Sequence, residues 1–451
     1  MKTFGEPLLS AVQSGALDEG IIDRALRRVL RQKIEVGLLD AGWSAEPDAL
    51  RRDSVDLDNA GNRDLARQVA EQSIILVSND GTLPLRSPAT IAIIGPNADT
   101  SAALLGCYSF PAHVGVQHPH SPVGLELPTL VDALRAEYPE AELRVALGTT
   151  IDGGETDGIA AAVELASGAD VVILALGDRA GLFGRGTSGE GCDVESLELP
   201  GAQRELVDAV LDTGVPTILT LFAGRPYALG RATTGAAAII EAFFPGEEGA
   251  GALAGVLSGR LNPSGRLPVS LPATPGSQPT TYLAAPLARA NDVSNIDPTP
   301  AFSFGHGLGY SPIEWSDAAL EGPAEVATDG TVTIALSVRN VGETAGVEVV
   351  QVYLHDPVAS VVRPVQRLVA YARVELAAGA AARVRFGLPA DLAQFTGRDG
   401  RRVVEPGALE FRLSRSVGET EAALAVTLTG PARVVDHTRA LHADVTVTPA
   451  G

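Results

Sequence analysis

The chain has 451 residues, of which 45% are apolar, so it is too long for a single hydrophobic core and suggests roughly two to three folding units. Lysine and arginine total 34 against 55 aspartate and glutamate, and the resulting net charge of −21 repels phosphate backbones and anionic membranes. We therefore expect no nucleic-acid and no membrane partner, whereas a neutral ligand such as a sugar is indifferent to this charge.

Two further features concern the cellular compartment. Residues 1–15 contain no apolar core of signal-peptide length, and no segment approaches the uninterrupted apolar length of a membrane span. Cys107 and Cys192 are the only cysteines, too few for a disulfide framework. We expect a soluble, cytoplasmic chain with two unpaired thiols, which would pair only if the loops that carry them meet.

The first predicted elements are two helices within residues 6–39. Apolar residues recur there at three- and four-residue steps, and Gly37 stands where a glycine would end the second helix. A single pair of helices cannot bury its own apolar stripe. The pair therefore either docks on the next domain of the chain or belongs to a domain that precedes it.

From residue 66 to residue 271, short apolar runs alternate with helical stretches. Runs without polar alternation that are separated by helices indicate a mostly parallel sheet covered on both faces, an α/β sandwich. The predicted strands are 91–94, 143–147, 171–176, 217–222 and 238–244, and the predicted helices are 129–137, 159–166, 203–211 and 247–257.

The last third of the chain has a different period. Residues 272–300 are rich in Pro, Thr, Ser and Ala, show no sustained period and indicate a linker. After FSFGHGLGYS, polar and apolar residues alternate from 331 to 339, and later stretches alternate in the same way between Gly and Asp turns. This pattern predicts a small antiparallel β-sandwich.

A ligand is expected at the loops that follow the parallel strands, because ligands bind outside the carboxyl ends of such strands. The loop GDRAGLFGRGTSGEGCD, residues 177–193, is far longer than a typical connection of up to about six residues. It carries acids and bases among glycines, whose backbone adopts conformations that other residues avoid. These charged residues are Asp178, Arg179, Arg185, Glu190 and Asp193.

Three interpretations of this loop compete. Gly184, Gly186 and Gly189 match a dinucleotide-binding fingerprint, but the match starts well beyond the strand and the next helix begins only around Pro200. Otherwise the charges are merely solvated, or a carboxyl group is presented to a sugar. Hydrolysis of a glycosidic bond takes two carboxyl groups, one to protonate the leaving oxygen and one to attack the anomeric carbon or activate water. A lone Glu is half of that mechanism.

The motif SGEGCD and the stretch LELPGAQRELVDAVLDTGVPTILTLFAGRPYAL resemble the second domain of glycoside hydrolase family 3 enzymes, especially bacterial β-xylosidases and β-glucosidases. ARQVAEQSIILVSNDGTLPL is similar to the family's entry into that domain, and FSFGHGLGYS to its junction with a fibronectin type III-like domain. The resemblance covers almost the whole chain. It implies a remnant of a (β/α)8-like barrel at 1–58, an α/β sandwich at 59–275, a linker at 276–305 and a fibronectin type III-like domain at 306–451.

The resemblance assigns Glu190 as the general acid/base of a retaining β-glycosidase, and we expect Leu182 and Phe183 to shield it in part, which favours a protonated acid. No metal or organic cofactor is implied. The family often has an arginine after the aspartate that follows the acid, and this sequence has Val194 after Asp193. Any role of that arginine is therefore not transferred.

The resemblance also suggests contacts to the sugar. Asp178, Arg179 and Arg185 are expected to orient sugar hydroxyls or Glu190 itself, with plain surface ion pairs as the alternative. His118 and His120 lie in a loop that is near the sugar pocket in xylosidase-like members, and a substrate contact is expected from one of them. A zinc site is disfavoured because these two and His113 lack a fourth ligand and helical spacing.

What this sequence lacks is equally informative. In these enzymes the nucleophile is an Asp in the N-terminal barrel, and residues 4–40 resemble only the final helices after the nucleophile strand. Neither Asp23 nor Asp40 is nominated as a substitute.

The expected reaction is retaining hydrolysis of terminal non-reducing β-linked xylose or glucose. We expect this chain to supply the acid/base and to be inactive when isolated. A separate barrel chain and a homo-oligomer are possible partners. The alternatives are a non-catalytic carbohydrate-binding or assembly protein, or a truncated fragment.

Overall fold

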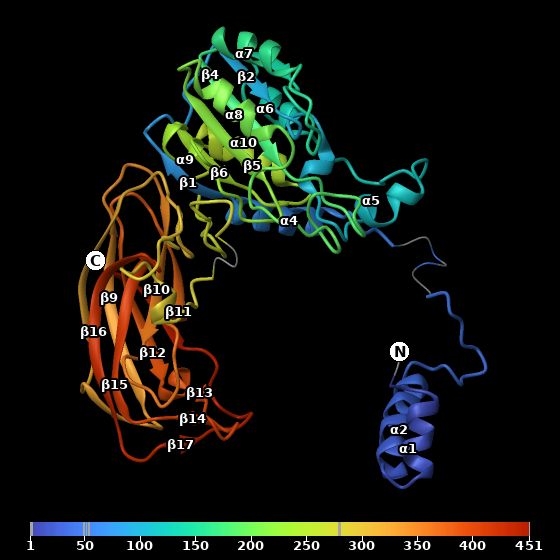
Figure 1. Ribbon diagram of the computed structural model, residues 1–451, viewed down its shortest axis with the longest axis vertical. Coiled ribbons are helices and arrows are strands. Elements are labelled where there is room, and N and C mark those ends of the chain that lie inside the picture. The colour runs from blue at the N-terminus through green and yellow to red at the C-terminus, as the bar shows by residue number, and fades with distance from the viewer. Residues whose placement is uncertain (1–2, 48–49, 51, 53–54, 278–280, 451) are drawn as a thin grey trace. The chain divides into compact units, whose positions relative to one another are not determined.

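The computed structural model describes residues 3–47, 50, 52, 55–277 and 281–450 (Figure 1). It divides into two compact units, Met1–Asn62 and Arg63–Gly451, and each is described by itself. Within the described residues, no helix combines the length and the apolar character that crossing a bilayer requires.

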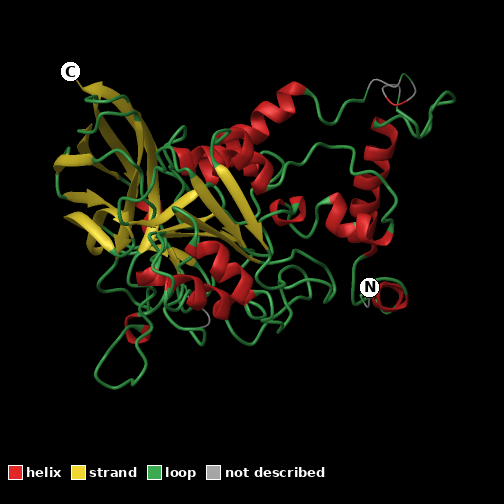
Figure 2. Ribbon diagram, turned by 90° about the horizontal axis from the view of Figure 1, so that it is seen from above, coloured by secondary structure: helices red, strands yellow, loops and turns green. Residues whose placement is uncertain are grey.

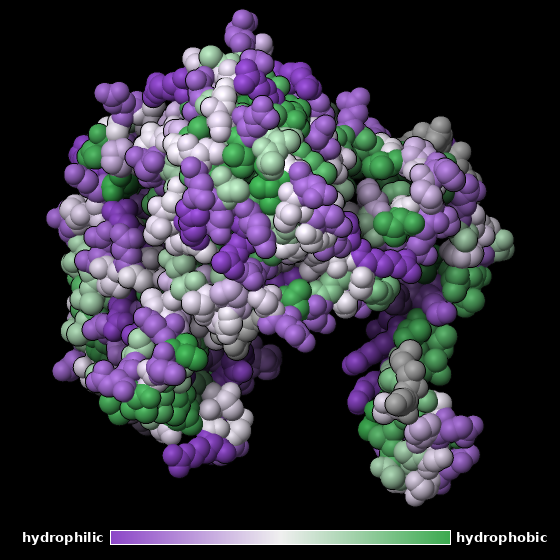
Figure 3. Space-filling model, turned by 45° about the horizontal axis from the view of Figure 1, so that its top comes forward, coloured by the Kyte–Doolittle hydropathy of each residue, from purple (hydrophilic) through white to green (hydrophobic). Residues whose placement is uncertain are grey.

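The first unit contains the two predicted helices, α1 (Glu6–Gln13) and α2 (Glu19–Glu35). The Asp18 side chain caps α2 by accepting a hydrogen bond from the backbone of Gly20 at 2.9 Å. Gly37 has a φ of 76° and follows the end of α2, as predicted. Neither helix buries a side chain, and the apolar residues that set their period are largely exposed, partly visible as green surface in Figure 3.

The second unit begins within α4 (Ala60–Ser73) and is built around a six-stranded sheet of order β1-β6-β5-β4-β2-β3. Every predicted strand is present, and these five strands are mutually parallel. The sixth, β1, was not predicted and pairs antiparallel with β6 at the edge. The strands are β1 (Ile75–Asn79), β2 (Thr90–Ile94), β3 (Glu142–Ala146), β4 (Val171–Gly177), β5 (Thr217–Phe222) and β6 (Ala238–Glu241).

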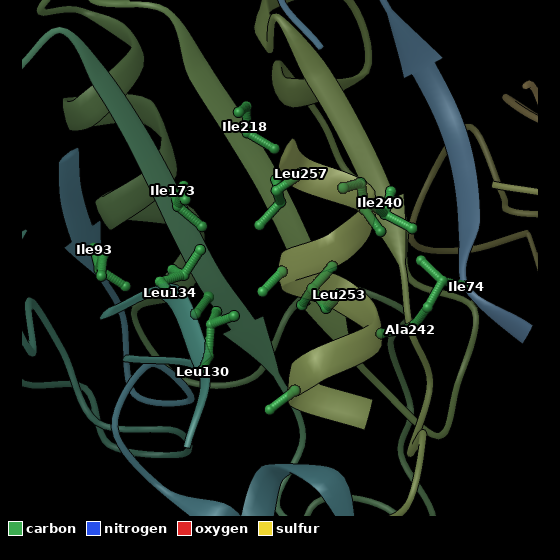
Figure 4. Close-up of a cluster of buried hydrophobic side chains, with 14 of the residues drawn as sticks. Ile74, Ile93, Leu130, Leu134, Ile173, Ile218, Ile240, Ala242, Leu253 and Leu257 are labelled. Atoms are coloured by element: carbon green, nitrogen blue, oxygen red, sulfur yellow. The ribbon is translucent and has the colours of Figure 1, made fainter. Parts of the chain in front are cut away.

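Helices cover both faces of this sheet, which explains why its buried strands lack polar alternation, whereas the edge strand β3 contains Glu142 and Arg144 (Figures 1 and 2). On one face α6 (Leu130–Glu137) and α10 (Gly249–Ser258) pack on the sheet, and on the other α7 (Ile159–Ser167) and α8 (Gln203–Leu211) do so. Figure 4 shows the first of these cores, formed by Ile93, Leu130, Leu134, Ile173, Ile218, Ile240, Leu253 and Leu257. The α/β sandwich is thereby confirmed.

Shorter helices lie in the connections of both domains. They are η1 (Ser101–Leu104), α5 (Phe110–His113), η2 (Gly115–Gln117), α9 (Ala232–Gly235), η3 (Pro286–Ala288) and η4 (Ala390–Ala393). Only η3 falls in the described part of the predicted linker, residues 272–277 and 281–300.

The predicted β-sandwich is also present. Its sheets have the orders β11-β10-β15-β16-β8 and β18-β12-β9-β7, with a small third sheet β13-β14-β17. Val332, Ile334, Leu336 and Val338 of β9 are buried, so the period of two marked the inward face correctly. The strands are β7 (Ile313–Leu320), β8 (Glu325–Ala327), β9 (Thr331–Asn340), β10 (Gly346–His355), β11 (Arg367–Leu376), β12 (Ala381–Pro389), β13 (Phe395–Thr396), β14 (Arg402–Val404), β15 (Gly407–Ser416), β16 (Glu419–Thr429), β17 (Arg433–Val434) and β18 (Asp444–Ala450).

A buried carboxylate, Glu348 on β10, joins the β-sandwich to the segment that leaves the α/β domain. One of its oxygens lies 3.2 Å from the Arg266 guanidinium, and the other lies 2.6 Å from that of Arg415 and accepts a hydrogen bond from the Trp315 indole. Burial lowers the pKa of Arg266, and the charge of Glu348 opposes that effect. The ion pair therefore compensates two charges that are both removed from water.

We predict that Glu348→Ala destabilises the second unit by about 3–5 kcal/mol, because it leaves the buried Arg266 charge without its partner. Chemical unfolding followed by circular dichroism measures the loss. Glu375→Ala removes an exposed partner of Arg373 on β11 and serves as the control, with little expected change. Equal effects of the two substitutions would contradict this account.

Candidate active site

The long loop after β4 folds back on itself, so that residues 179–183, the first limb, are hydrogen-bonded to residues 187–190, the second limb. The Thr187 amide donates to the carbonyl of Arg179 at 2.9 Å, and the Phe183 amide donates to the carbonyl of Glu190 at 2.8 Å. Gly189 has a φ of 128°, and a Cβ atom there would lie 2.0 Å from the carbonyl oxygen of Gly181. Only glycine fits at this position, so the residue before Glu190 is fixed by steric necessity.

Asp178 begins this loop and is fully buried beneath it. Its Oδ1 accepts hydrogen bonds from the hydroxyls of Thr187 at 2.7 Å and Tyr227 at 2.6 Å, and its Oδ2 accepts one from the backbone of Gly224 at 2.9 Å. Burial, with the Asp178 charge adding to it, raises the pKa of Glu241 at the end of β6. The hydrogen bonds of Asp178 attach the second limb of the loop to the connection after β5. A direct contact of Asp178 with a sugar remains an untested prediction.

Arg225 clamps the same loop from the side. It lies in the connection after β5, and its guanidinium donates to the carbonyl of Thr187 and to that of Cys192, each at 2.7 Å. These two carbonyls stand before and after Glu190 in the chain. One planar side chain thus fixes both approaches to Glu190, because a guanidinium presents several donors in a rigid plane.

Glu190 itself is exposed, and its carboxylate accepts a hydrogen bond from the hydroxyl of Tyr108. That hydrogen bond, followed by desolvation and the charge of Glu190, raises the pKa of Tyr108. The expected shielding by Leu182 and Phe183 is not observed. Leu182 is buried, whereas Phe183 is 67% exposed and reaches Glu190 through its backbone amide, which donates to the Glu190 carbonyl.

The other predicted contact residues lie on the surface around this loop. Arg179 forms an exposed ion pair with Asp152 at 2.6 Å. Arg185 is exposed and lines, with Arg179, a mostly apolar cavity of about 170 Å³ under the first limb. His118 and His120 are exposed on the segment after η2. Their contact with substrate stays a prediction.

The structure brings residues to Glu190 that the sequence did not single out. Tyr108 precedes α5 and is 82 positions away in the chain, and its ring meets the His113 ring edge-on at 5.8 Å. Tyr108 and Gly189 also line an open hollow of about 570 Å³ together with Arg225. Arg225 lies in the loop that follows the predicted strand 217–222, so the rule for parallel strands marked its loop although it did not single out its side chain.

Three further groups of residues are the glycines of the loop, the two cysteines and the side chains that could bind a metal. Gly184, Gly186 and Gly189 lie within the long loop after β4, and the next helix begins only at Gln203, so the context of a dinucleotide site is missing. Cys107 and Cys192 are both free thiols. Among the described residues, no group of three or more His, Cys, Asp or Glu side chains is arranged to hold a metal ion.

Comparison with known proteins decides the family. Residues 74–310 match the glycosyl hydrolase family 3 C-terminal domain, and residues 348–417 match the fibronectin type III-like domain. The chain belongs to glycosyl hydrolase family 3. The first of these matches contains the whole Glu190 loop, the Tyr108 segment and Arg225, so the geometry described above lies inside the family's own domain.

The curated relatives have names of two kinds. The chain is 32% identical over 402 residues to a "Beta-xylosidase" of Formosa agariphila, covering 88% of this chain and 53% of the relative. It is 31% identical over 437 residues to a "Periplasmic beta-glucosidase" of Salmonella typhimurium, covering 90% and 55%. The chain therefore spans about half the length of the curated relatives that it matches.

Solved β-glucosidase structures contain the same fold. A β-glucosidase from Listeria innocua in complex with isofagomine superposes with a TM-score of 0.80 at 29% identity, covering 94% of this chain and 58% of that chain. A β-glucosidase from Erythrobacter marinus gives a TM-score of 0.77 at 31% identity, with 94% and 57% covered. Nearly all of this chain is thus shared with them, and a large part of each of them lies outside it.

We predict that Arg225→Ala loosens the Glu190 loop without unfolding the domain, because it removes the donors to Thr187 and Cys192. Hydrogen–deuterium exchange of peptides from 179–192 should become faster, while peptides from β4 and β5 stay protected. Arg231→Ala removes an exposed partner of Asp212 at the start of α9 and is the control. Unchanged exchange in the Arg225 variant would show that the clamp is dispensable.

Proposed function

We propose that this chain carries the general acid/base, Glu190, of a retaining β-glycosidase that acts on terminal non-reducing β-linked xylose or glucose. The observation that carries the proposal is the position of Glu190: an exposed carboxyl group at the carboxyl end of a parallel sheet, on a loop fixed by Asp178 and Arg225. A proton donor has to be held in one place and still face a substrate.

The mechanism uses Glu190 twice. As an acid it protonates the glycosidic oxygen while a nucleophile attacks the anomeric carbon, and as a base it then removes a proton from the water that hydrolyses the glycosyl-enzyme. Asp178 is poorly placed to be that nucleophile, since it is buried and both of its oxygens already accept hydrogen bonds. We place the nucleophile in an N-terminal barrel outside these 451 residues, either in a longer protein or on a separate chain.

The substrate class rests on the two kinds of named relatives, a β-xylosidase and a β-glucosidase. Two groups of side chains are proposed to contact sugar hydroxyls. The first is Arg179 and Arg185 of the Glu190 loop, and the second is His118 or His120 on the segment after η2. Asp178 is proposed to act through Thr187 on the loop. The exposed apolar helices α1 and α2 favour a barrel as partner over the alternative of a non-catalytic carbohydrate-binding protein.

The isolated chain is predicted not to hydrolyse aryl β-xylosides or β-glucosides at a useful rate. A general acid alone contributes ~10²- to 10⁴-fold, far less than glycosidases achieve. Release of p-nitrophenol by the purified chain measures this, with the chain plus its barrel as the positive control. Turnover by the chain alone that is stopped by a covalent glycosyl-trapping inhibitor would reveal a nucleophile within these residues.

In the active enzyme, this chain together with the barrel, Glu190→Gln should give a loss that depends on the leaving group. Substrates with a basic leaving group should slow by ~10²- to 10⁴-fold, while activated aryl glycosides should still form the glycosyl-enzyme. Azide should then restore turnover, because a small anion needs no general base. Glu195→Gln, an exposed acid after the same loop, is the control and should show neither effect.

Equal slowing of activated and unactivated substrates, with no response to azide, would remove Glu190 from the chemistry. The acid/base would then have to be sought elsewhere in the enzyme.

A further inference from the structure

The contact between Tyr108 and Glu190 joins two segments that are far apart in sequence. The phenol hydroxyl donates to Oε2 of Glu190, and both side chains are exposed. The hydrogen bond to Glu190, followed by desolvation and the Glu190 charge, raises the pKa of Tyr108, so the phenol keeps its proton and stays a donor. The hydrogen bond thus has one fixed direction at neutral pH.

Tyr108 is held in place independently of Glu190. The Ser109 amide donates to the carbonyl of Gly106 at 3.0 Å, which turns the chain, and the Ser109 hydroxyl caps α5. The Tyr108 ring meets His113 of that helix edge-on, with the centroids 5.8 Å apart. The Tyr108 hydroxyl is therefore positioned by the turn at Gly106–Ser109 and by the start of α5.

The two segments also cross closely beside the contact. A Cβ atom at Gly189 would lie only 2.8 Å from the Cβ of Cys107. Each partner of the hydrogen bond is thus one residue from a point where the two backbones pass each other with no room for a larger side chain. This crossing restricts the separation of the two backbone segments that carry Tyr108 and Glu190.

We propose that Tyr108 is a positioning residue for Glu190, an inference that rests on the proposed role of Glu190 as acid/base. Because Tyr108 occupies Oε2, the catalytic proton resides on Oε1. When that proton passes to the glycosidic oxygen, the resulting carboxylate keeps the Tyr108 hydrogen bond on Oε2, and Oε1 is free to take a proton from water in the second step. The same donor serves both protonation states without rearrangement.

The contact is tested first on the chain as it stands, by ¹³C NMR of tyrosine Cζ atoms. The Tyr108 resonance is assigned by its disappearance in Tyr108→Phe, and its titration is followed against that of Tyr371, an exposed tyrosine of the β-sandwich. In Glu190→Gln, Tyr108 should titrate at lower pH and Tyr371 should not move. An unchanged Tyr108 titration would overturn the contact, and with it the proposal.

The role is tested in the active enzyme with the barrel present. Tyr108→Phe should lower kcat for substrates with basic leaving groups by roughly tenfold, about the contribution of one hydrogen bond to a charged group, and should affect activated aryl glycosides much less. KM should change little, and Tyr371→Phe should behave like the unaltered enzyme.

Equal slowing on all substrates, or no slowing, would overturn the positioning role while leaving the acid/base role of Glu190 intact. That role is judged separately, by Glu190→Gln and azide. Tyr108 is 65% exposed, so its replacement is not expected to unfold the chain, and the NMR test uses that variant only to assign the resonance that is then titrated in the unaltered chain.

Discussion

The buried carboxylate of Asp178 is the constraint on which the geometry of this site depends. A carboxylate removed from water is costly unless donors surround it, and here three of them do. Thr187 belongs to the second limb of the Glu190 loop, whereas Gly224 and Tyr227 belong to the connection after β5. Satisfying one charge therefore fixes the loop against the neighbouring strand, and Arg225 from that same connection completes the attachment.

The fold was predictable where the burial of an element produces a recognisable pattern of apolar residues in the sequence. The strands β2, β4, β5 and β6 are largely buried on both sides because helices cover both faces, so each appears as a mainly apolar run, whereas the edge strand β3 contains Glu142 and Arg144. The sixth, β1, was missed for a local reason. Ile75–Asn79 follows α4 almost without a break, and an apolar run that continues a helical pattern gives no sign of a change of structure.

The site was predictable only in part, because the sequence indicates features of a single loop but not the contacts between segments that are far apart in the chain. The length of the loop and its resemblance to the family pointed to Glu190, and the rule for parallel sheets marked the connection that holds Arg225. Neither observation could predict the contact of Tyr108 with Glu190, because that contact depends on how the segment before α5 crosses the loop at Gly189. Shielding of Glu190 by Phe183 was expected for the same reason, because neighbours in the sequence do not reveal that Phe183 is exposed.

The exposure of Glu190 bears on where the rest of the site lies. A retaining mechanism needs a second carboxyl group about 5–5.5 Å from the first, and Asp178 is committed to holding the loop. On the proposed function, the second group approaches Glu190 from solvent. Tyr108, whose hydroxyl donates to the Glu190 carboxylate, and Phe183, whose amide donates to the Glu190 carbonyl, are both exposed. A body that covered them would bury apolar surface and remove water from the acid in the same step, which is the environment that proton transfer to a sugar requires.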